Sequence, residues 1–394
     1  MKEDWKIVRL GDCVSLLGDG LHGTPKYSEN GEYAFINGNN LVNGKIVIKP
    51  ETKKVSYEEY QKYKKDLNNR TILVSINGTL GNVGVFNNEK IILGKSACYF
   101  NVLPNIDKAF IKYVVNSSEF KTYLEINATG TTIKNISLAQ MRNYTFSLPP
   151  LSTQQKIAQI LSSLDDKIEL NNKINDNLEQ QAQALFYQLF AEKIENVTDS
   201  TGIPLGDIVE IIDNRGKTPP SKSERNQFPI LDVGALNSSG RIINYKNCTK
   251  FVDEETYNTF FRKGHPQEND ILISTVGSLA QMKFFKGNSG CIAQNVVAFR
   301  TINLSPTYLY EYLKFIRNDL LAYDIGSVQP SIKVTHIIKH LIYIPTDDEL
   351  KSFDTYAKSI TEQIYKNVCE NEKLVLLRDT LLPKLMSGEI EVEE

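Results

Sequence analysis

The sequence has little of what a secreted, membrane-bound or metal-dependent protein needs. It has five cysteines in 394 residues, none in a Cys-x-x-Cys pair, and only four histidines. No uninterrupted apolar run approaches the ~20 residues of a membrane-spanning helix. The first ten residues mix charged and apolar side chains and lack the apolar centre of a signal peptide. We therefore expect a cytoplasmic protein with buried free thiols, no metal site and no membrane contact.

Motifs that would make the chain a catalyst on its own are also missing. It has neither the Asn-Pro-Pro-Tyr-like motif of amino-methyltransferases nor a glycine-rich S-adenosylmethionine loop. Gly94-Lys95-Ser96 resembles the end of a P-loop, but Glu89 stands where that motif requires glycine. His336 and His340 have the spacing of a zinc-binding helix without its glutamate, so a surface or core pair is the better interpretation. We expect no catalytic residue and no cofactor in this chain.

Charge is unevenly distributed along the chain, although the net charge is only −2. Residues 1–150 carry 19 Lys and Arg against 14 Asp and Glu, and residues 196–345 carry 16 against 14. Residues 151–195 carry 4 against 7, and residues 346–394 carry 6 against 12. The two longer segments are therefore basic and the shorter ones acidic. This pattern permits DNA binding by the longer segments, because phosphates respond to local potential rather than to whole-chain charge.

The chain is one unit written twice, about 196 residues apart. The matching segments are VRLGD (8–12) with IPLGD (203–207), NGKI (43–46) with SGRI (239–242), ILVSINGTL (72–80) with ILISTVGSL (271–279), and Gly130 with Gly326. A repeat this long indicates a duplicated domain, because the units of solenoid proteins run only 20–50 residues.

The first part of each copy is typical of short strands joined by turns. Apolar runs such as TILVSI and ACYFNV alternate with Asn-Gly, Gly-Asn and Pro turn signals. Residues 111–124 place Ile111, Val114, Val115 and Leu124 on one face of an expected helix. We therefore expect an α+β fold for each globular part.

The second part of each copy predicts a long helix. From Leu151 to about residue 190 there is no Gly or Pro, and apolar residues recur in steps of three and four, as in a coiled-coil seam. Polar residues interrupt the seam at equivalent positions of both copies: Asn171, Asn175, Asn367 and Asn371. A buried asparagine needs a polar partner and so sets helix register. The alternative is that this stretch is simply exposed.

This order of parts resembles the specificity subunit of Type I restriction-modification systems. The segment LPPLSTQQKIAQILSSLDDKIELNNKINDNLEQQAQALFYQLF looks like the central conserved region of that family, and LLRDTLLPKLMSGEIEV looks like its carboxyl-terminal one. The Thr-Pro turns and the ILxSxxGxL strands are similar to those of its target-recognition domains. The resemblance covers essentially the whole chain. It implies target-recognition domains at 1–150 and 196–345, with helices at 151–195 and 346–394 forming an antiparallel coiled coil.

The resemblance also implies a function. Each target-recognition domain would read one half of an asymmetric bipartite site on double-stranded DNA, and the coiled coil would set the spacing and dock two methyltransferase subunits. Those partners would bind S-adenosylmethionine and methylate adenine, and restriction/translocase subunits could join them. One alternative is a coiled-coil adaptor with duplicated protein- or glycan-binding modules. Another is a methyltransferase or nuclease fused to recognition domains, which the missing motifs disfavour.

Polar residues in the turns of the globular parts are our candidates for DNA contacts. Base edges are read by Arg, Lys, Asn, Gln, Ser and Thr, and phosphates are bound by Lys, Arg and backbone amides. The candidates of the first part are Thr24, Lys26, Asn37, Asn39, Asn40, Asn77 and Lys134. Those of the second part are Arg215, Lys217, Thr218, Lys222, Gln281, Gln294, Gln329 and Lys333. For each residue the alternative is a turn-forming or solvated surface role.

Overall fold

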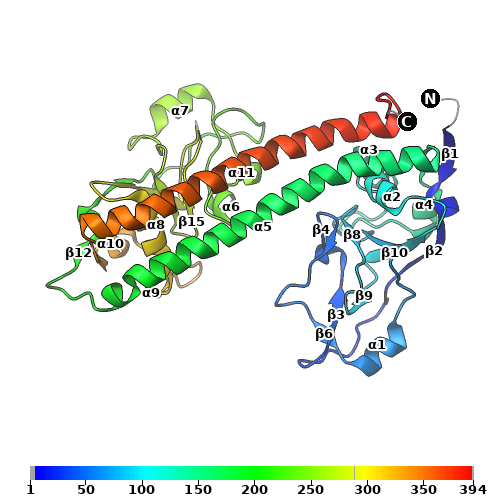
Figure 1. The fold of residues 1–394 in the computed structure, drawn as a ribbon, viewed down its shortest axis with the longest axis horizontal. Coiled ribbons are helices and arrows are strands. Elements are labelled where there is room, and N and C mark those ends of the chain that lie inside the picture. The colour runs from blue at the N-terminus through cyan, green and yellow to red at the C-terminus, as the bar shows by residue number, and fades with distance from the viewer. Residues whose placement is uncertain (1–4, 288, 393–394) are drawn as a thin grey trace. The chain divides into compact units, whose positions relative to one another are not determined.

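Each globular part is followed in the chain by a long helix, α5 (Leu151–Glu195) or α11 (Asp347–Ser387), in the computed structural model (Figure 1). The structure describes residues 5–287 and 289–392. Mixed strands and helices with two long helices confirm the predicted α+β class.

The chain divides into two compact units, and the boundary between them crosses both long helices. Unit 1 consists of Met1–Lys167 and Lys373–Glu394, and unit 2 of Ile168–Glu372. Each unit therefore holds one globular part and a portion of both helices. The division into segments 1–150, 151–195, 196–345 and 346–394 stays a prediction.

The described residues of unit 1 form many short strands and four short α-helices besides the portions of α5 and α11. Its strands are β1 (Lys6–Arg9), β2 (Val14–Asp19), β3 (Tyr33–Ile36), β4 (Leu41–Val42), β5 (Lys45–Ile46), β6 (Lys54–Val55), β7 (Thr71–Ser75), β8 (Val83–Val85), β9 (Ile91–Leu93), β10 (Ala97–Val102) and β11 (Thr145–Leu148). Its helices are η1 (Leu10–Cys13), η2 (Gly38–Asn40), α1 (Tyr57–Tyr63), α2 (Lys108–Val114), α3 (Ser118–Asn127) and α4 (Leu138–Asn143).

Unit 2 has the same mixture of short strands and helices, with fewer strands in its described residues. Its strands are β12 (Ile203–Pro204), β13 (Val209–Ile212), β14 (Ile271–Ser274), β15 (Met282–Phe284), β16 (Val296–Thr301) and β17 (Leu341–Ile342). Its helices are η3 (Leu205–Asp207), α6 (Val233–Leu236), η4 (Tyr245–Asn247), α7 (Glu254–Phe260), α8 (Pro306–Phe315), α9 (Arg317–Ala322) and α10 (Val334–Ile337).

A four-stranded antiparallel sheet forms the centre of each unit. The order is β2-β10-β7-β8 in unit 1 and β13-β16-β14-β15 in unit 2. Equivalent residues occupy equivalent places, since Phe100 lies opposite Leu17 and Ile72, as Phe299 lies opposite Ile211 and Ile271. The sequence repeat is therefore a structural repeat at the level of strand register.

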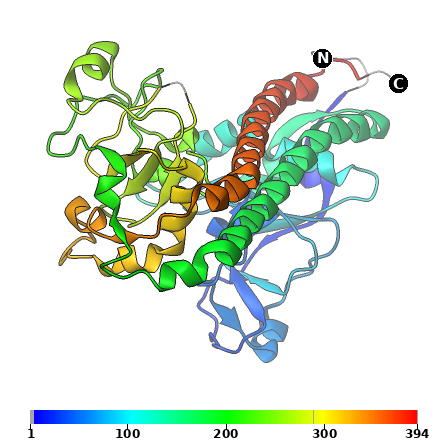
Figure 2. The same cartoon turned by 60° about the vertical axis from the view of Figure 1, so that its left-hand side comes forward.

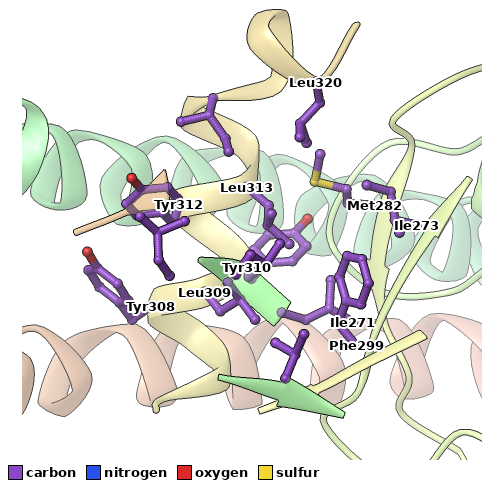
Figure 3. Packing of buried hydrophobic residues seen from close by; sticks show 14 of the residues in the cluster. Ile271, Ile273, Met282, Phe299, Tyr308, Leu309, Tyr310, Tyr312, Leu313 and Leu320 are labelled. Atoms are coloured by element: carbon purple, nitrogen blue, oxygen red, sulfur yellow. The ribbon is translucent and has the colours of Figure 1, made fainter. Parts of the chain in front are cut away.

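The central strands are mostly apolar because both faces of each sheet are covered. In unit 2, Ile271 and Phe299 point to one core cluster, and Leu272 and Ala298 point to another on the opposite face. Figure 3 shows α8 packed against the first face, with Leu309 lying over the sheet. Buried apolar side chains on both faces hold the strand ends, and thus the turns between them, in place.

Within unit 2 the two long helices run side by side in opposite directions (Figures 1 and 2). Asn171 donates to Asn371 at 2.9 Å, and Asn367 donates to Asn175 at 2.7 Å. Residue numbers therefore rise along α5 while those of the partners on α11 fall, as in an antiparallel pair. The start of α11 is a capping box, because Thr346 N–H donates to Glu349 Oε2 at 2.9 Å while Thr346 Oγ1 accepts from Glu349 N. The predicted antiparallel pairing is confirmed.

One expected helix is in fact two. The single helix predicted for residues 111–124 is wrong, because α2 ends at Val114 and α3 begins at Ser118. Ser117 causes the break, since its Oγ accepts a hydrogen bond from Phe120 N at 3.2 Å and so caps a new helix.

The cysteines are free thiols, four of them buried and Cys369 partly exposed. Burial raises the pKa of Cys13 and Cys248 to about 11 and that of Cys291 to about 12. Within residues 5–287 and 289–392, no helix combines the length and apolar character needed to cross a bilayer.

Candidate nucleic-acid interface

In unit 1, a closed turn follows the central strand β7. The Ser75 hydroxyl donates to Thr79 O at 2.6 Å and accepts from Asn82 N at 2.8 Å. Gly78 and Gly81 have φ angles of 76° and 77°, a conformation that suits glycine. The hydrophobic strand thus leads into a rigid turn with little freedom to reorient.

Two further loops of unit 1 meet this turn. Gly78 N donates to Lys134 O at 2.9 Å, and the Asn77 amide donates to Asn135 at 3.2 Å. On the other side, Ile76 N donates to Ser96 O at 3.0 Å. Three segments that are distant in sequence therefore form one polar edge.

The structure brings some first-part candidates together and separates others. Asn37 joins Asn77 and Lys134 at this edge, because its Oδ1 accepts from the Ser96 hydroxyl at 2.9 Å. Thr24 and Lys26 are exposed on a neighbouring loop, where Lys26 N donates to Glu59.

The two remaining first-part candidates lie in η2 and differ in exposure. Asn39 is exposed. Asn40 is only 6% exposed, and its amide donates to Val47 O at 3.0 Å and accepts from Asn37 N at 3.0 Å. Its side chain supports the turn, so its role as a DNA contact stays a prediction that this geometry does not favour.

Unit 2 builds the same edge from different side chains. The Ser274 hydroxyl donates to Ser278 O and accepts from Gln281 N at 2.9 Å. Gly277 N then donates to Pro330 O at 3.0 Å, and Thr275 N donates to Asn295 O at 2.8 Å. The turn after β14 is therefore joined to two loops, as the turn after β7 is in unit 1.

Several second-part candidates lie along this edge. The Gln294 amide donates to the Thr218 hydroxyl at 2.8 Å, which brings the 213–222 loop to the same edge. Gln329 lies next to the turn, because a Cβ atom placed on Gly277 would be 3.8 Å from the Gln329 Nε2 atom. Lys217 is exposed in the 213–222 loop, and Gln281 is partly exposed at the end of the turn.

Two basic candidates of unit 2 have their own local geometry. The Arg215 guanidinium donates two hydrogen bonds to the Asp213 carboxylate, at 2.8 and 2.6 Å. Burial raises the pKa of Asp213, but the contacts with Arg215 outweigh it and the net shift is downward. Lys222 is exposed, and its backbone pairs with Phe251. A DNA base would have to compete with Asp213 for the guanidinium.

Lys333 and the two histidines lie at and near α10. Lys333 is exposed at the N-terminus of α10. His340 Nδ1 lies 2.9 Å from the Tyr323 hydroxyl, and the His336 ring lies 6.1 Å from the Tyr323 ring. In the described ranges no group of three His, Cys, Asp or Glu side chains is placed to hold a metal ion.

Sequence reasoning missed the apolar tips of two of these loops. Ile133, beside Lys134, is 60% exposed, and Val328, beside Gln329, is 99% exposed. Only the matched glycines Gly130 and Gly326 indicated that these loops are equivalent. An exposed apolar side chain among polar ones can contact a thymine methyl group.

The candidate coiled-coil asparagines lie between the two long helices in unit 2. Asn171 and Asn367 are 1% and 6% exposed, and Asn175 is 8% exposed. Asn171 also donates to Glu370 at 2.7 Å, and Asn371 donates to Asn172 at 2.9 Å. Each amide finds a polar partner across the seam, but their effect on register stays a prediction.

A family model described as the Type I restriction modification DNA specificity domain matches residues 2–180 and 198–369. The chain belongs to the Type I restriction-modification DNA specificity family. The two matches cover most of the chain, one in each copy of the repeat, and every member loop of the two polar edges lies inside them. The resemblance seen in the sequence is confirmed, as is the assignment as a specificity subunit with two target-recognition domains.

Curated relatives and a solved structure are similar to this family member over most of their lengths. The MjaIX specificity subunit of Methanocaldococcus jannaschii is 24% identical, with 100% of this chain and 95% of that protein covered. The HindI specificity subunit of Haemophilus influenzae is 25% identical, with 73% and 78% covered. The crystal structure of the Type I S subunit from M. genitalium has a TM-score of 0.58 at 19% identity, covering 100% and 99%, and shares the fold.

Proposed function

We propose that this specificity subunit reads a bipartite site on double-stranded DNA, one half with each globular part. The observation that supports this most directly is the repeated polar edge. Ser75 and Ser274 close the same turn in both units, whereas the polar residues around it differ, Asn77 and Lys134 in one and Gln294 and Lys217 in the other. A shared frame with different polar groups suits two readers of different sequences. The full site is then asymmetric.

The rest of the complex would supply the chemistry. The chain itself is non-catalytic in this proposal and holds no cofactor. Two methyltransferase subunits dock on the long helices, bind S-adenosylmethionine and methylate adenine, and restriction/translocase subunits join them for cleavage. The complex would act in the cytoplasm, where the host DNA lies. The long acidic segments 151–195 and 346–394 suit a scaffold held away from phosphates.

Binding measurements with the partner methyltransferase test this proposal. Modified adenines are mapped in a host with and without this chain, and the duplex so identified is compared with one whose halves are scrambled. We expect a preference for the mapped duplex and an affinity that falls steeply as salt rises, because phosphate contacts release counterions. A complex that shows no preference for any duplex would exclude DNA reading and favour the adaptor. Methylation or cleavage by the purified chain alone would contradict the non-catalytic assignment.

Substitutions in one unit test whether the halves are read independently. Lys217→Ala should weaken reading of one half-site only, and Lys134→Ala should weaken reading of the other. Lys246→Ala is a matched control, because Lys246 is an exposed lysine of unit 2 that is not a candidate contact. Equal loss at both half-sites from either change would contradict independent reading.

A further inference from the structure

The globular part of unit 2 is attached to both long helices through an aromatic cluster. Phe186 of α5 packs against Tyr308 of α8 and Phe353 of α11, with ring centroids 5.5 and 5.7 Å apart. All three side chains are at most 2% exposed. Hydrophobic contact of this kind is strong but largely non-directional. Alone, it would hold the globular part without fully determining its rotation.

A second attachment is polar and directional. Arg241, in the segment between α6 and η4, is 0% exposed. Its Nε and one terminal nitrogen donate to both carboxylate oxygens of Glu179 on α5, each at 2.9 Å. Its other terminal nitrogen donates to Thr361 Oγ1 on α11 at 2.9 Å. One side chain of the globular part therefore bonds to both long helices.

The same guanidinium is also tied to its own globular part. Glu311 of α8 accepts from Arg241 at 2.9 Å and is itself 1% exposed. Lys286 adds a nearby link, because its Nζ donates to Glu362 of α11 at 2.6 Å. A guanidinium is planar and presents its donors in fixed directions. These bonds can all form only when α5, α8 and α11 keep one mutual orientation.

The two attachments lie far enough apart to resist rotation. Glu179 precedes Phe186 by seven residues on α5, and Phe353 precedes Thr361 by eight on α11. At ~1.5 Å per residue these separations are about 10 and 12 Å along the helices. A swivel about the aromatic cluster would pull Arg241 away from its partners, and a buried cation without its carboxylate is strongly unfavourable.

We propose that Arg241, together with Glu179 and Thr361, is a positioning group that fixes how many base pairs separate the two half-sites. This inference rests on the proposed function. Each added base pair moves the next half-site by ~3.4 Å and turns it by about 35° around the duplex. A recognition domain held at one angle cannot follow that turn, whereas one held only by the aromatic cluster can swivel toward it.

A version of the cluster in which Arg241, Glu179 and Glu311 are all neutral tests this without leaving any one of these three charges buried opposite a missing partner. The variant is Arg241→Met with Glu179→Gln and Glu311→Gln in the full chain, assembled with its methyltransferase partner. Substrates carry both mapped half-sites with spacers from two base pairs shorter to two longer than the native one, and methylation rates are measured. We expect the preference for the native spacer over its neighbours to fall roughly tenfold, about 1.4 kcal/mol. Half-site sequence preference should stay at the wild-type level.

The control is a charged pair inside the globular part that leaves the long helices untouched. The Arg300 guanidinium donates two hydrogen bonds to the Asp270 carboxylate, at 3.1 and 2.8 Å. Arg300→Met with Asp270→Asn therefore removes an arginine–carboxylate pair, as the cluster variant does. It should lower the thermal midpoint and leave spacer preference unchanged. If the neutral cluster variant does not fold, Thr361→Val removes only the hydroxyl that accepts from Arg241 and donates to Ala357 O within α11, and it should shift spacer preference in the same direction by less.

The outcomes separate this inference from the proposed function. A folded cluster variant with wild-type spacer preference would overturn it, as would an equal loss of rate at every spacer length. An unchanged preference in Thr361→Val would count against it in the same way. A wild-type complex without any sequence preference would instead refute the proposed function.

Discussion

Replacing Asn367 by leucine should destabilise unit 2 more than replacing both Asn367 and Asn175. The Asn367 amide donates to Asn175 Oδ1 at 2.7 Å, and the two side chains are 6% and 8% exposed. In Asn367→Leu the Asn175 carbonyl stays buried with that partner gone. Gln363, which also donates to Asn367, is exposed and can turn to water.

The magnitudes follow from the asymmetry of buried hydrogen bonds. A buried polar group left without its partner costs about 1–3 kcal/mol, and we expect this for each single leucine variant. Replacing both amides by apolar groups is nearly neutral or stabilising, as at the seam of a coiled coil. The coupling energy of the double-mutant cycle should therefore be about 1–3 kcal/mol, with the double variant more stable than the sum predicts.

Urea unfolding followed by circular dichroism at the helix band measures these differences in the full chain. The single tryptophan, Trp5, lies in unit 1, where a Cβ built on Gly388 would be 3.4 Å from its ring. Its fluorescence reports on unit 1 separately and should move less than the helix signal. Additive single costs, with a coupling energy near zero, would refute the argument that Asn175 and Asn367 are energetic partners.

Three further outcomes follow from the structure. If Lys217 contacts a phosphate, Lys217→Ala should reduce the slope of log affinity against log salt by about one. Burial raises the pKa of Asp165 but the contact with Arg378 helps to lower it, with a net downward shift, so the stability it provides is present above about pH 4 and lost as pH falls below. Asp165→Asn should therefore flatten the acid unfolding of unit 1, followed by Trp5 fluorescence; an unchanged acid profile would contradict this. In the native chain a thiol reagent should modify Cys369 before the buried Cys291, and equal rates would contradict the burial described here.

The long helices were predictable because helix formation depends on a local pattern. The steps of three and four around Asn171 and Asn175 are visible in the sequence, and α5 and α11 follow them. The break at Ser117 was missed because a serine in an otherwise helical stretch either points to solvent or caps a new helix. Which of these occurs depends on the packing of α2 and α3 against the sheet.

The polar edges were predictable in outline but not residue by residue. Turn residues such as Asn77 and Gln294 were found because Asn, Gly and Gln in turns mark loops. The partners of Asn40 and Arg215 could not be found, because Val47 O and Asp213 become neighbours only through turn geometry. A polar residue in a turn supports the fold or reads a ligand, and only its hydrogen bonds distinguish the two.

The repeat also predicts that each globular part joins the helices in an equivalent way, and this holds for one position. Thr361 follows Asp165 by 196 residues. Thr361 accepts a hydrogen bond from Arg241 of its globular part, and Asp165 accepts from Lys112 and Tyr113 of the other globular part. Each acceptor also binds an arginine, which is the same Arg241 for Thr361 and is Arg378 of α11 for Asp165. The acceptors are equivalent in position, but one is neutral and the other is charged.

The donors are not equivalent, and this limits what the repeat can predict. Arg241 belongs to a globular part and aligns with the exposed Lys45, whereas Arg378 belongs to a long helix and aligns with the buried Ala182. Breaking a buried ion pair by removing one partner costs about 3–5 kcal/mol, so Arg241 and Glu179 can be exchanged only together. Each globular part is therefore matched to the helix surface it occupies. Moving one into the place of the other would require its junction residues to move with it, even though the sheets and turns of the two copies agree.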